Sequence, residues 1–342
     1  MSGTKIILGL LGFVALLAIL VLGRPLLAPL VFTFLVWALV NAVADWLQRM
    51  RLPRWLAWFG ALALLVAGLY FIVLIISSEA GQFTAEAPAY GTKLQQILAR
   101  VLTPLHLRLN FTDLLSRFNF AAVLTGAAAS VGSSAFAIVQ VFIYLGFLLA
   151  EQSLFSAKYE TLETDFARRQ AGLFVLQKIS GQLQSFLAVY TVLSAIIGIA
   201  AYVLLAILGV PFAAFMALII FVLGYIPTIG AIAIVLPALV ALVQFGSFGL
   251  PLLIVAALGV LHFVLMDIIS TKWLGSSLNL SPFIIIVALS FWGLIWGVAG
   301  LFLAVPLTAA IAIACAHVER LRWISILLAA PRTRKGELQV AT

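Results

Sequence analysis

The chain has little charge: only 9% of its 342 residues are Asp, Glu, Lys or Arg, whereas 65% are hydrophobic. So few charged side chains cannot cover the surface of a water-soluble globule of this length. Apolar runs recur along the chain and reach about 20 residues, which is the length that an α-helix needs to cross a bilayer. The composition therefore predicts an all-α, polytopic helical membrane protein whose main partner is the lipid bilayer.

Cysteine and histidine are also scarce. The one cysteine, Cys315, lies in an apolar run, so the chain can form neither an internal disulfide nor a thiolate metal site. The sequence has no H-E-x-x-H motif and no phosphate-binding glycine loop. Gly275-Ser276-Ser277 with His317 faintly resembles the serine and histidine of a rhomboid-type protease, but a Gly-x-Ser triplet is a weak signal. We expect no catalytic residues, cofactor or metal, and an intramembrane enzyme is the least favoured function.

Two further classes are excluded by patterning. The apolar runs are continuous, whereas the strands of a membrane β-barrel alternate apolar and polar residues. The net charge is +8, but the basic residues stand at the ends of the apolar runs and do not form a soluble basic face. We therefore expect no nucleic-acid partner.

The alternation of apolar and charged segments predicts six parts. The first apolar run is kept as a membrane helix because a second follows it at once, with no soluble domain of the kind that follows a signal peptide. Thr92 and Gln95 resemble a capping box and predict the start of a helix in the first charged segment. The parts are three transmembrane helices (1–76), an extracytoplasmic helical insertion (77–118), a fourth transmembrane helix (119–150), a cytoplasmic amphipathic helix (151–185), a transport core (186–318) and a cytoplasmic basic tail (319–342).

Two segments of the core, 211–245 and 283–317, are too long for one span and carry Gly and Pro at membrane depth. Such breaks persist only where they are buried in protein or line a cavity, and paired broken helices indicate a transporter's binding site. We therefore predict two interrupted helical hairpins flanking one long helix, from Leu250 to about Ser270. The predicted helix breaks and substrate pathway are Gly224, Tyr225, Pro227, Thr228, Gly230, Trp292, Gly293, Gly297, Gly300 and Pro306.

Polar residues within apolar runs give the remaining chemical signal. Asp267 is a candidate coupling residue because an ionisable side chain in a spanning segment is costly unless it faces a cavity or a partner. The alternative is that it lies at the membrane interface near Lys272. His262 is a candidate proton carrier, and a histidine hydrogen-bonded within the helix bundle is the simpler interpretation. Asn279 completes this polar set.

Several motifs carry a family resemblance. The stretch GYIPTIG from Gly224 to Gly230, and the succession FWG, WGVAG and AVPLT between Leu280 and Thr308, resemble the two signature regions of the autoinducer-2 exporter family. The resemblance extends over almost the whole chain. It implies helical protomers in a homo-oligomer, with a pentamer as the expected number. It also implies export of a small polar signalling molecule, and some relatives are instead associated with sodium/proton antiport.

The predicted function is therefore export of a small, polar, uncharged metabolite or signalling molecule by alternating access. The alternative is antiport of sodium or another cation with protons. The chain differs from the family pattern after the long helix. Where the family often has Asn-x-x-x-Pro-Arg followed by Gly and Arg, this chain has Asp267, Thr271, Lys272, Gly275 and Ser276.

Basic residues predict the orientation in a bacterial cytoplasmic (inner) membrane. If both termini are cytoplasmic, most of the 19 Lys and Arg residues lie inside, in agreement with the positive-inside rule. The basic residues left outside are Arg24, Lys93, Arg100, Arg108 and Arg117.

Cysteine labelling tests this orientation. In a Cys315→Ala background, single cysteines at Arg51, Gln170 and Thr333 are expected to react with a membrane-impermeant maleimide only from the cytoplasmic side. A cysteine at Thr103 is expected to react only from outside. Reaction of the Thr103 cysteine from inside would contradict the predicted topology.

Overall fold

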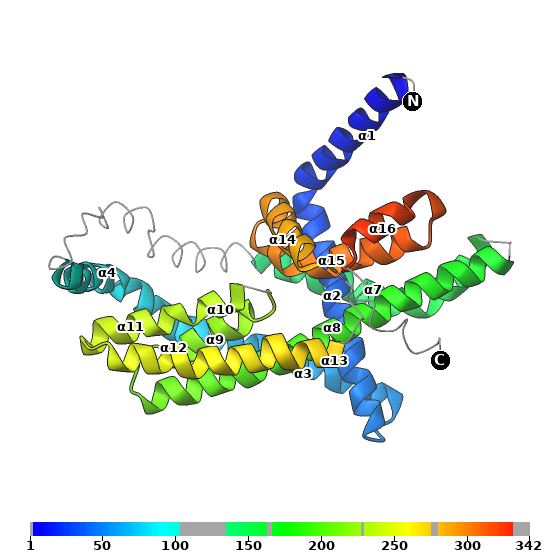
Figure 1. The fold of residues 1–342 in the computed structure, drawn as a ribbon. Helices are drawn as coiled ribbons and strands as arrows, with labels where there is room; N and C mark the ends of the chain where they lie inside the picture. Colours follow the sequence, from blue (N-terminus) through cyan, green and yellow to red (C-terminus); the bar gives the residue numbers. More distant parts are fainter. Residues whose placement is uncertain (1–2, 103–134, 163–165, 227–228, 275–279, 331–342) are drawn as a thin grey trace, which may run out of the picture. The chain divides into compact units, whose positions relative to one another are not determined.

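The computed structural model describes residues 3–102, 135–162, 166–226, 229–274 and 280–330 (Figure 1). Within these residues the secondary structure is helical, and the sole β pairing is an isolated bridge between Leu280 and Ala329. The protein is thus an all-α polytopic membrane protein, as the composition predicts. Five helices among the described residues are long and apolar enough to cross a membrane: Arg24–Arg49, Arg54–Phe83, Gly172–Ile207, Gly249–Leu274 and Val298–Ala316.

The chain divides into two compact units. Unit 1 comprises Met1–Ala42, Ile138–Leu187 and Leu274–Thr342, and unit 2 comprises Val43–Ala137 and Ala188–Trp273. Each predicted hairpin lies in a different unit. Helices α2 (Arg24–Arg49) and α8 (Phe166–Ile207) have long parts in both units, and the boundaries also cut the ends of α7 (Ala135–Leu162) and α13 (Ser270–Leu274).

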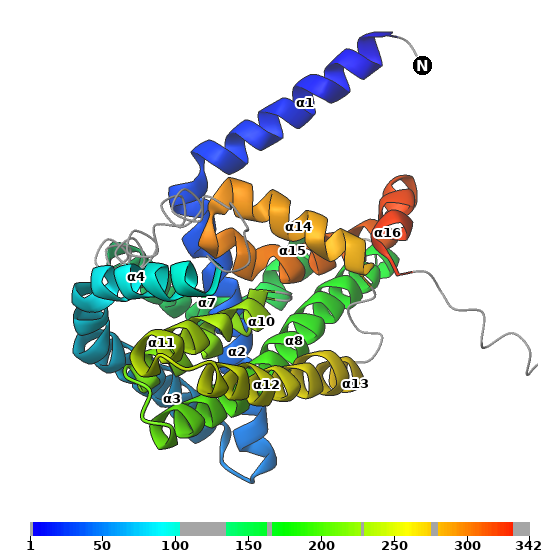
Figure 2. The ribbon, with the colours of Figure 1, turned by 60° about the vertical axis from the view of Figure 1, so that its left-hand side comes forward.

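Unit 2 holds the first hairpin and the long helix. In Figures 1 and 2 the second arm of the hairpin runs beside the long helix, which continues without a gap from α12 through a π-helical segment, η3, into α13. This agrees with the prediction of one helix after the first hairpin. The elements are α3 (Arg54–Ile75), η1 (Ile76–Ala80), α4 (Gly81–Leu102), α9 (Ala213–Leu223), α10 (Ile229–Ala233), α11 (Val235–Phe245), α12 (Gly249–His262), η3 (Phe263–Ile269) and α13 (Ser270–Leu274).

Three side chains attach the insertion after α3 to the two ends of the first hairpin. The Glu79 carboxylate accepts a 2.9 Å hydrogen bond from the backbone N–H of Phe215 in the first turn of α9, where N–H groups lack partners within the helix. The Phe83 ring packs edge-on against Phe212, with the ring centroids 5.2 Å apart. The Tyr90 hydroxyl donates to the side-chain oxygen of Gln244 near the end of α11. Burial, together with the negative charge of Glu86, raises the pKa of Tyr90, so the phenol remains a donor at neutral pH.

The predicted helix start at Thr92 is wrong. Helix α4 begins at Gly81, directly after η1, and Thr92 lies in its interior, where its hydroxyl donates to the carbonyl of Ala89. Because α3, η1 and α4 follow one another without an interruption, this helix needs no separate start signal.

Unit 1 holds the second hairpin, formed by α14 (Pro282–Trp296) and α15 (Val298–Ala316), which lie side by side in Figures 1 and 2. After α15 the chain turns through η4 (Glu319–Leu321) into α16 (Arg322–Leu328), which folds back onto α15. The backbone N–H of Ser281 then bonds to the carbonyl of Leu328. The first residues of the predicted basic tail are therefore helical and packed.

The charged segment between the fourth and fifth predicted spans also differs from expectation. It is not a separate amphipathic helix, because α7 (Ala135–Leu162) extends into it and α8 continues from Phe166 through the predicted fifth span to Ile207. The first half of α8 contains two glycines, Gly172 and Gly181, and the helix contains no proline to end it near residue 185. Residues 121–134 of the predicted fourth span lie outside the described residues. The membrane side of each of the six predicted parts remains a prediction.

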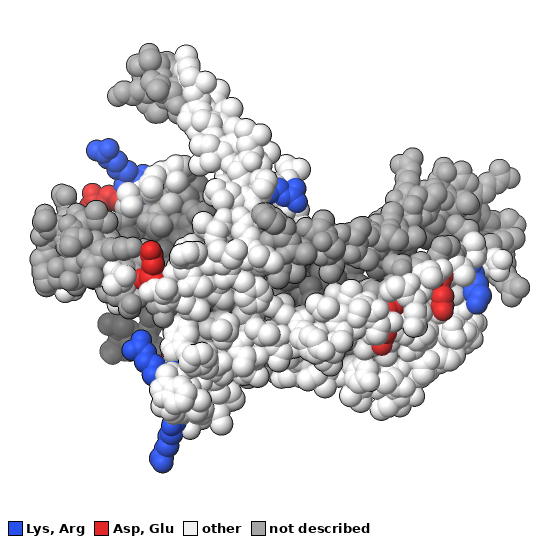
Figure 3. Space-filling view, turned by 180° about the vertical axis from the view of Figure 1, so that it is seen from behind, with Lys and Arg blue, Asp and Glu red and all other residues white. Residues whose placement is uncertain are grey.

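The surfaces of the helices suit a lipid environment. In α1 (Gly3–Leu22) the side chains of Leu10, Leu11 and Val14 are exposed. Figures 1 and 2 show that most of this helix projects past α14, its neighbour in unit 1. Figure 3 shows one face of the molecule, on which charged side chains are few and are separated by wide areas of other residues. Such exposed apolar helices are stable when lipid covers them.

Candidate solute-binding site

The break in the first hairpin lies where the sequence predicts it. Helix α9 ends at Leu223, and the last turn tightens, because the N–H groups of Tyr225 and Ile226 bond to carbonyls only three residues before them. The chain resumes a helix at α10, and Gly230 is the second residue of that helix. Pro227 and Thr228 lie outside the described residues.

Hydroxyl groups of α8 support this break. A Cβ atom on Gly224 would lie 2.6 Å from the Ser194 hydroxyl oxygen, so only glycine allows this approach. The Ser194 hydroxyl is fully buried and has no hydrogen-bond partner among the described residues. The Tyr225 hydroxyl donates a 2.7 Å hydrogen bond to Thr191, one turn away on α8.

Sequence reasoning missed Thr191 and Ser194. They stand three residues apart, on one face of an otherwise apolar span. Small hydroxyl residues at such spacing indicate a close helix contact within a membrane. That signal could have identified α8 as the support of the hairpin.

The long helix contacts the other side of the break through His262. Its side chain is 8% exposed, and its Nε2 atom would lie 2.9 Å from a Cβ atom placed on Gly230. The imidazole therefore packs directly against the hairpin backbone, in space that any side chain at position 230 would occupy.

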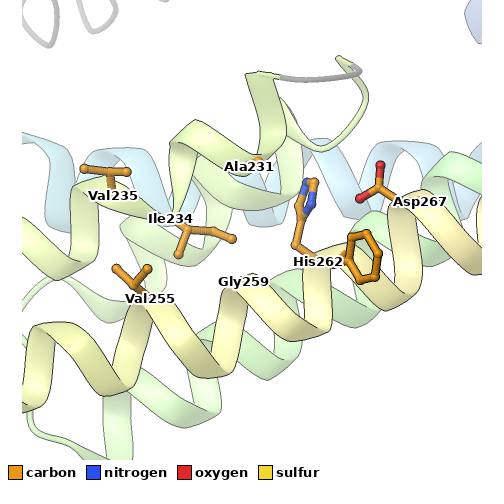
Figure 4. A pocket seen from close by; sticks show the side chains of 8 residues that line it. Ala231, Ile234, Val235, Val255, Gly259, His262 and Asp267 are labelled. Atoms are coloured by element: carbon orange, nitrogen blue, oxygen red, sulfur yellow. The ribbon is translucent and has the colours of Figure 1, made fainter. Parts of the chain in front are cut away.

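A π-helical segment brings His262 and Asp267 together. In an α-helix, residues five apart point about 140° away from each other. Directly after His262 the helix becomes π-helical from Phe263 to Ile269, and the N–H of Ser270 bonds to the carbonyl of Leu265, five residues back. A π turn holds more residues than an α turn, so residues five apart come close to one line. Figure 4 shows both side chains on the side of the helix that faces α10, and Asp267 acts electrostatically on His262.

These elements line an open cavity of about 220 Å³ between the hairpin and the long helix. A cavity of this size suits a small metabolite. The polar lining groups, His262 and Asp267, stand at one end (Figure 4), and the rest of the lining is apolar. The apolar lining residues are Ala231, Ile234, Val235, Val255, Gly259 and Phe263.

The other predicted polar residues lie apart from this lining. Lys272 is exposed on α13 and does not line the cavity. Asn279 lies outside the described residues. Asp267 forms no ion pair within the part of the chain that the structure describes. Tyr190 of α8 lies near it, in side-chain hydrogen-bond contact with Ser270.

The second hairpin has a single break. Gly297 has φ +63°, a conformation that favours glycine, and forms the turn between α14 and α15. Gly293, Gly300 and Pro306 lie inside these two helices, so the prediction that they interrupt the hairpin is wrong. Gly300 has a packing role, because a Cβ atom there would overlap the carbonyl oxygen of Trp292.

Two tryptophans hold the second hairpin in place. The Trp292 indole N–H donates to the hydroxyl of Thr308, which joins α14 to α15. The Trp296 indole N–H donates to the carbonyl of Leu20 at the end of α1, 3.0 Å away. The Arg24 guanidinium lies 3.2 Å from the position of a Cβ atom on Gly297. The turn that connects α1 to α2 therefore contacts the tip of this hairpin.

Comparison with known proteins agrees with this architecture. Residues 10–320 match the family described as AI-2E family transporter. The chain belongs to this family. It is 26% identical over 335 residues to the AI-2 transport protein TqsA of Escherichia coli (strain K12), covering 96% of each chain. It is 28% identical to the "Putative transport protein" of Haemophilus influenzae over 327 residues, covering 91% of this chain and 92% of that one. Membership of the AI-2E family makes the protein a membrane transporter, and the names of these relatives point to transport and not to catalysis.

Alanine at Gly300 tests the close contact within the second hairpin of this AI-2E family member. The added methyl group overlaps a backbone carbonyl, so Gly300→Ala is expected to destabilise the protein by about 3 kcal/mol, at the upper end of overpacking costs. Gly68→Ala is the matched control, because a Cβ atom on Gly68 in α3 meets nothing within 4 Å. The control is expected to stabilise slightly, since alanine favours a helix over glycine by about 1 kcal/mol. Thermal unfolding in detergent measures both; equal melting temperatures would contradict the contact.

A double substitution tests the contact between Gly230 and His262. Gly230→Ala is expected to impair transport because the methyl group displaces the imidazole from the cavity. Adding His262→Ala should restore part of the packing, and thus part of the lost thermal stability, because it removes the obstructing ring. Rescue is expected to be partial, since the methyl group also lies 3.2 Å from the Leu223 carbonyl. If the two destabilisations simply add, the side chains are not in contact.

Proposed function

We propose that this protein exports a small polar metabolite or signalling molecule, resembling autoinducer-2, by alternating access around its two hairpins. The observation that carries the proposal is the cavity between the break of the first hairpin and the polar face of the long helix. Its position fits the rule that irregular backbone at membrane depth lines a solute site. The name of TqsA, an AI-2 transport protein, supports the choice of solute.

The contacts across the break suit a moving element. The Ser194 side chain packs against Gly224, and the His262 side chain packs against Gly230. In both places a side chain therefore contacts backbone that carries no side chain. Surfaces that do not interdigitate can separate without forcing side chains past one another. Movement of the hairpin away from the long helix would open the cavity, and its return would close it.

Two contacts support the proposed orientation, with both termini in the cytoplasm of a bacterial inner membrane. In unit 1, Arg24, which the charge pattern places outside, meets the tip of the hairpin that enters from the cytoplasm. In unit 2, Glu79 at the start of the extracytoplasmic insertion bonds to the first turn of α9, where the first hairpin enters from outside. Each contact joins segments that the proposed topology assigns to the same side.

The family resemblance further supports assembly as a homo-oligomer, for which we propose a pentamer. The second candidate function is antiport of a cation and protons. The observation that favours it is Asp267, a carboxylate at a membrane cavity that forms no ion pair within the described residues.

Transport by the purified protein in proteoliposomes tests both functions. Export predicts that autoinducer-2 or a related small polyol enters inside-out vesicles faster than it enters protein-free vesicles. If a cation gradient drives transport, Asp267→Asn should abolish its dependence on pH or sodium gradients and leave the assembly intact. Gradient dependence that survives in the variant would exclude Asp267 from coupling. No transport of any small solute by a folded protein would refute the export function.

A further inference from the structure

We infer that the cavity binds a small aliphatic amine in its ammonium form, with the charged head at Asp267 and the hydrocarbon along the apolar wall. The inference rests on the proposed function, because it names the class of solute that this site would carry. It departs from the uncharged solute that the sequence pattern predicts.

The charge of the lining favours a cation. Asp267 is the only acidic side chain in the lining, and it forms no ion pair within the described residues. The lining supplies neither Lys nor Arg to receive an anion. Because a carboxylate in a membrane-spanning helix is stabilised by a cationic partner, a solute with a positive head would stabilise the site.

The ligands offered do not suit a metal ion. Hard cations such as Ca²⁺ take about six to eight oxygen ligands, whereas the side chains of this lining supply only the oxygens of Asp267 and the nitrogens of His262. The described residues contain no group of three or more His, Cys, Asp or Glu side chains placed to hold a metal. An ammonium group needs fewer partners, since it can donate one hydrogen bond to the carboxylate and another to a ring nitrogen of neutral His262.

The remaining lining selects for a hydrocarbon part. Ile234, Val235 and Val255 form the apolar wall away from the polar end, as the labelled side chains in Figure 4 show. A solute that was polar over its whole surface would lose hydration along this wall without forming new hydrogen bonds. The cavity of about 220 Å³ is smaller than the pockets that hold drug-sized ligands, so an amine with a chain of a few carbons fits better than a drug-sized cation.

Three probes of nearly equal size separate charge from shape: n-butylammonium, 1-butanol and butyrate. Equilibrium binding of each labelled probe to the full-length protein in detergent is measured at neutral pH. We expect butylammonium to bind at least about tenfold more tightly than 1-butanol, as a charge-assisted hydrogen bond implies, and butyrate not to bind. Asp267→Asn is expected to remove this preference while the protein stays folded.

Gly259 provides a matched test of the location. A Cβ atom on Gly259 meets nothing within 4 Å, and this residue lines the cavity, so the side chain of Gly259→Leu is expected to occupy cavity space. The control is Gly68→Leu, at a glycine in α3 that also has open space around its Cβ position and does not line the cavity. Gly259→Leu is expected to abolish butylammonium binding, and Gly68→Leu to leave it unchanged.

Several results would overturn the inference. They are equal binding of butylammonium and 1-butanol, unchanged amine binding in Asp267→Asn or Gly259→Leu, and displacement of the amine by equimolar sodium, which would indicate a metal-ion site. Failure here is distinct from failure of the proposed function. Vesicles that carry a neutral polyol while the protein ignores amines would refute the inference alone, whereas amine binding without transport of any solute would refute the proposed function alone.

Discussion

Peptide groups inside a membrane have no water to bond to, and the rest of this structure depends on that constraint. Each place where a helix is interrupted must be enclosed by other parts of the protein. At the first hairpin the backbone tightens after Leu223, and hydroxyls of α8 lie against Gly224 and Tyr225. At the second, the N–H of Gly297 returns to the carbonyl of Gly293. The breaks are thus stabilised by nearby groups. The first break depends on α8, which supplies the hydroxyl groups packed against it.

Glycine has two roles here that look the same in a sequence. At Gly297 it permits a backbone conformation that other residues rarely adopt, and it ends a helix there. At Gly300 it permits close approach of two helices while the helix continues. Proline shows a similar ambiguity, because Pro306 stands inside an unbroken helix where its missing N–H is tolerated. Composition and apolar runs were sufficient to predict the fold class, the hairpins and the long helix. Whether a given glycine or proline ends a helix could not be predicted, because that depends on the backbone of the neighbouring helix.

The candidate site shows the same limit. His262 and Asp267 could be selected from the sequence because each is an ionisable residue in an apolar run. Their proximity could not be predicted, since residues five apart in a regular α-helix point in different directions. Nor could the sequence show that Gly230 provides the space for the imidazole, because that contact joins residues from two separate helices. Local pattern therefore identified the chemical groups, while packing between helices determined which of them share a cavity.

The π-helical segment from Phe263 to Ile269 also has a consequence for how the chain tolerates change. A π turn accommodates one residue more than an α turn, so it amounts to an insertion within an otherwise regular helix. Loss of a single residue between His262 and Asp267 would let the helix become regular, with the two residues four apart and only about 40° apart around the helix axis. The meeting of imidazole and carboxylate consequently depends on the match between residue spacing and helix type, because a spacing of five residues requires the π turn, whereas a spacing of four would require a regular α-helix.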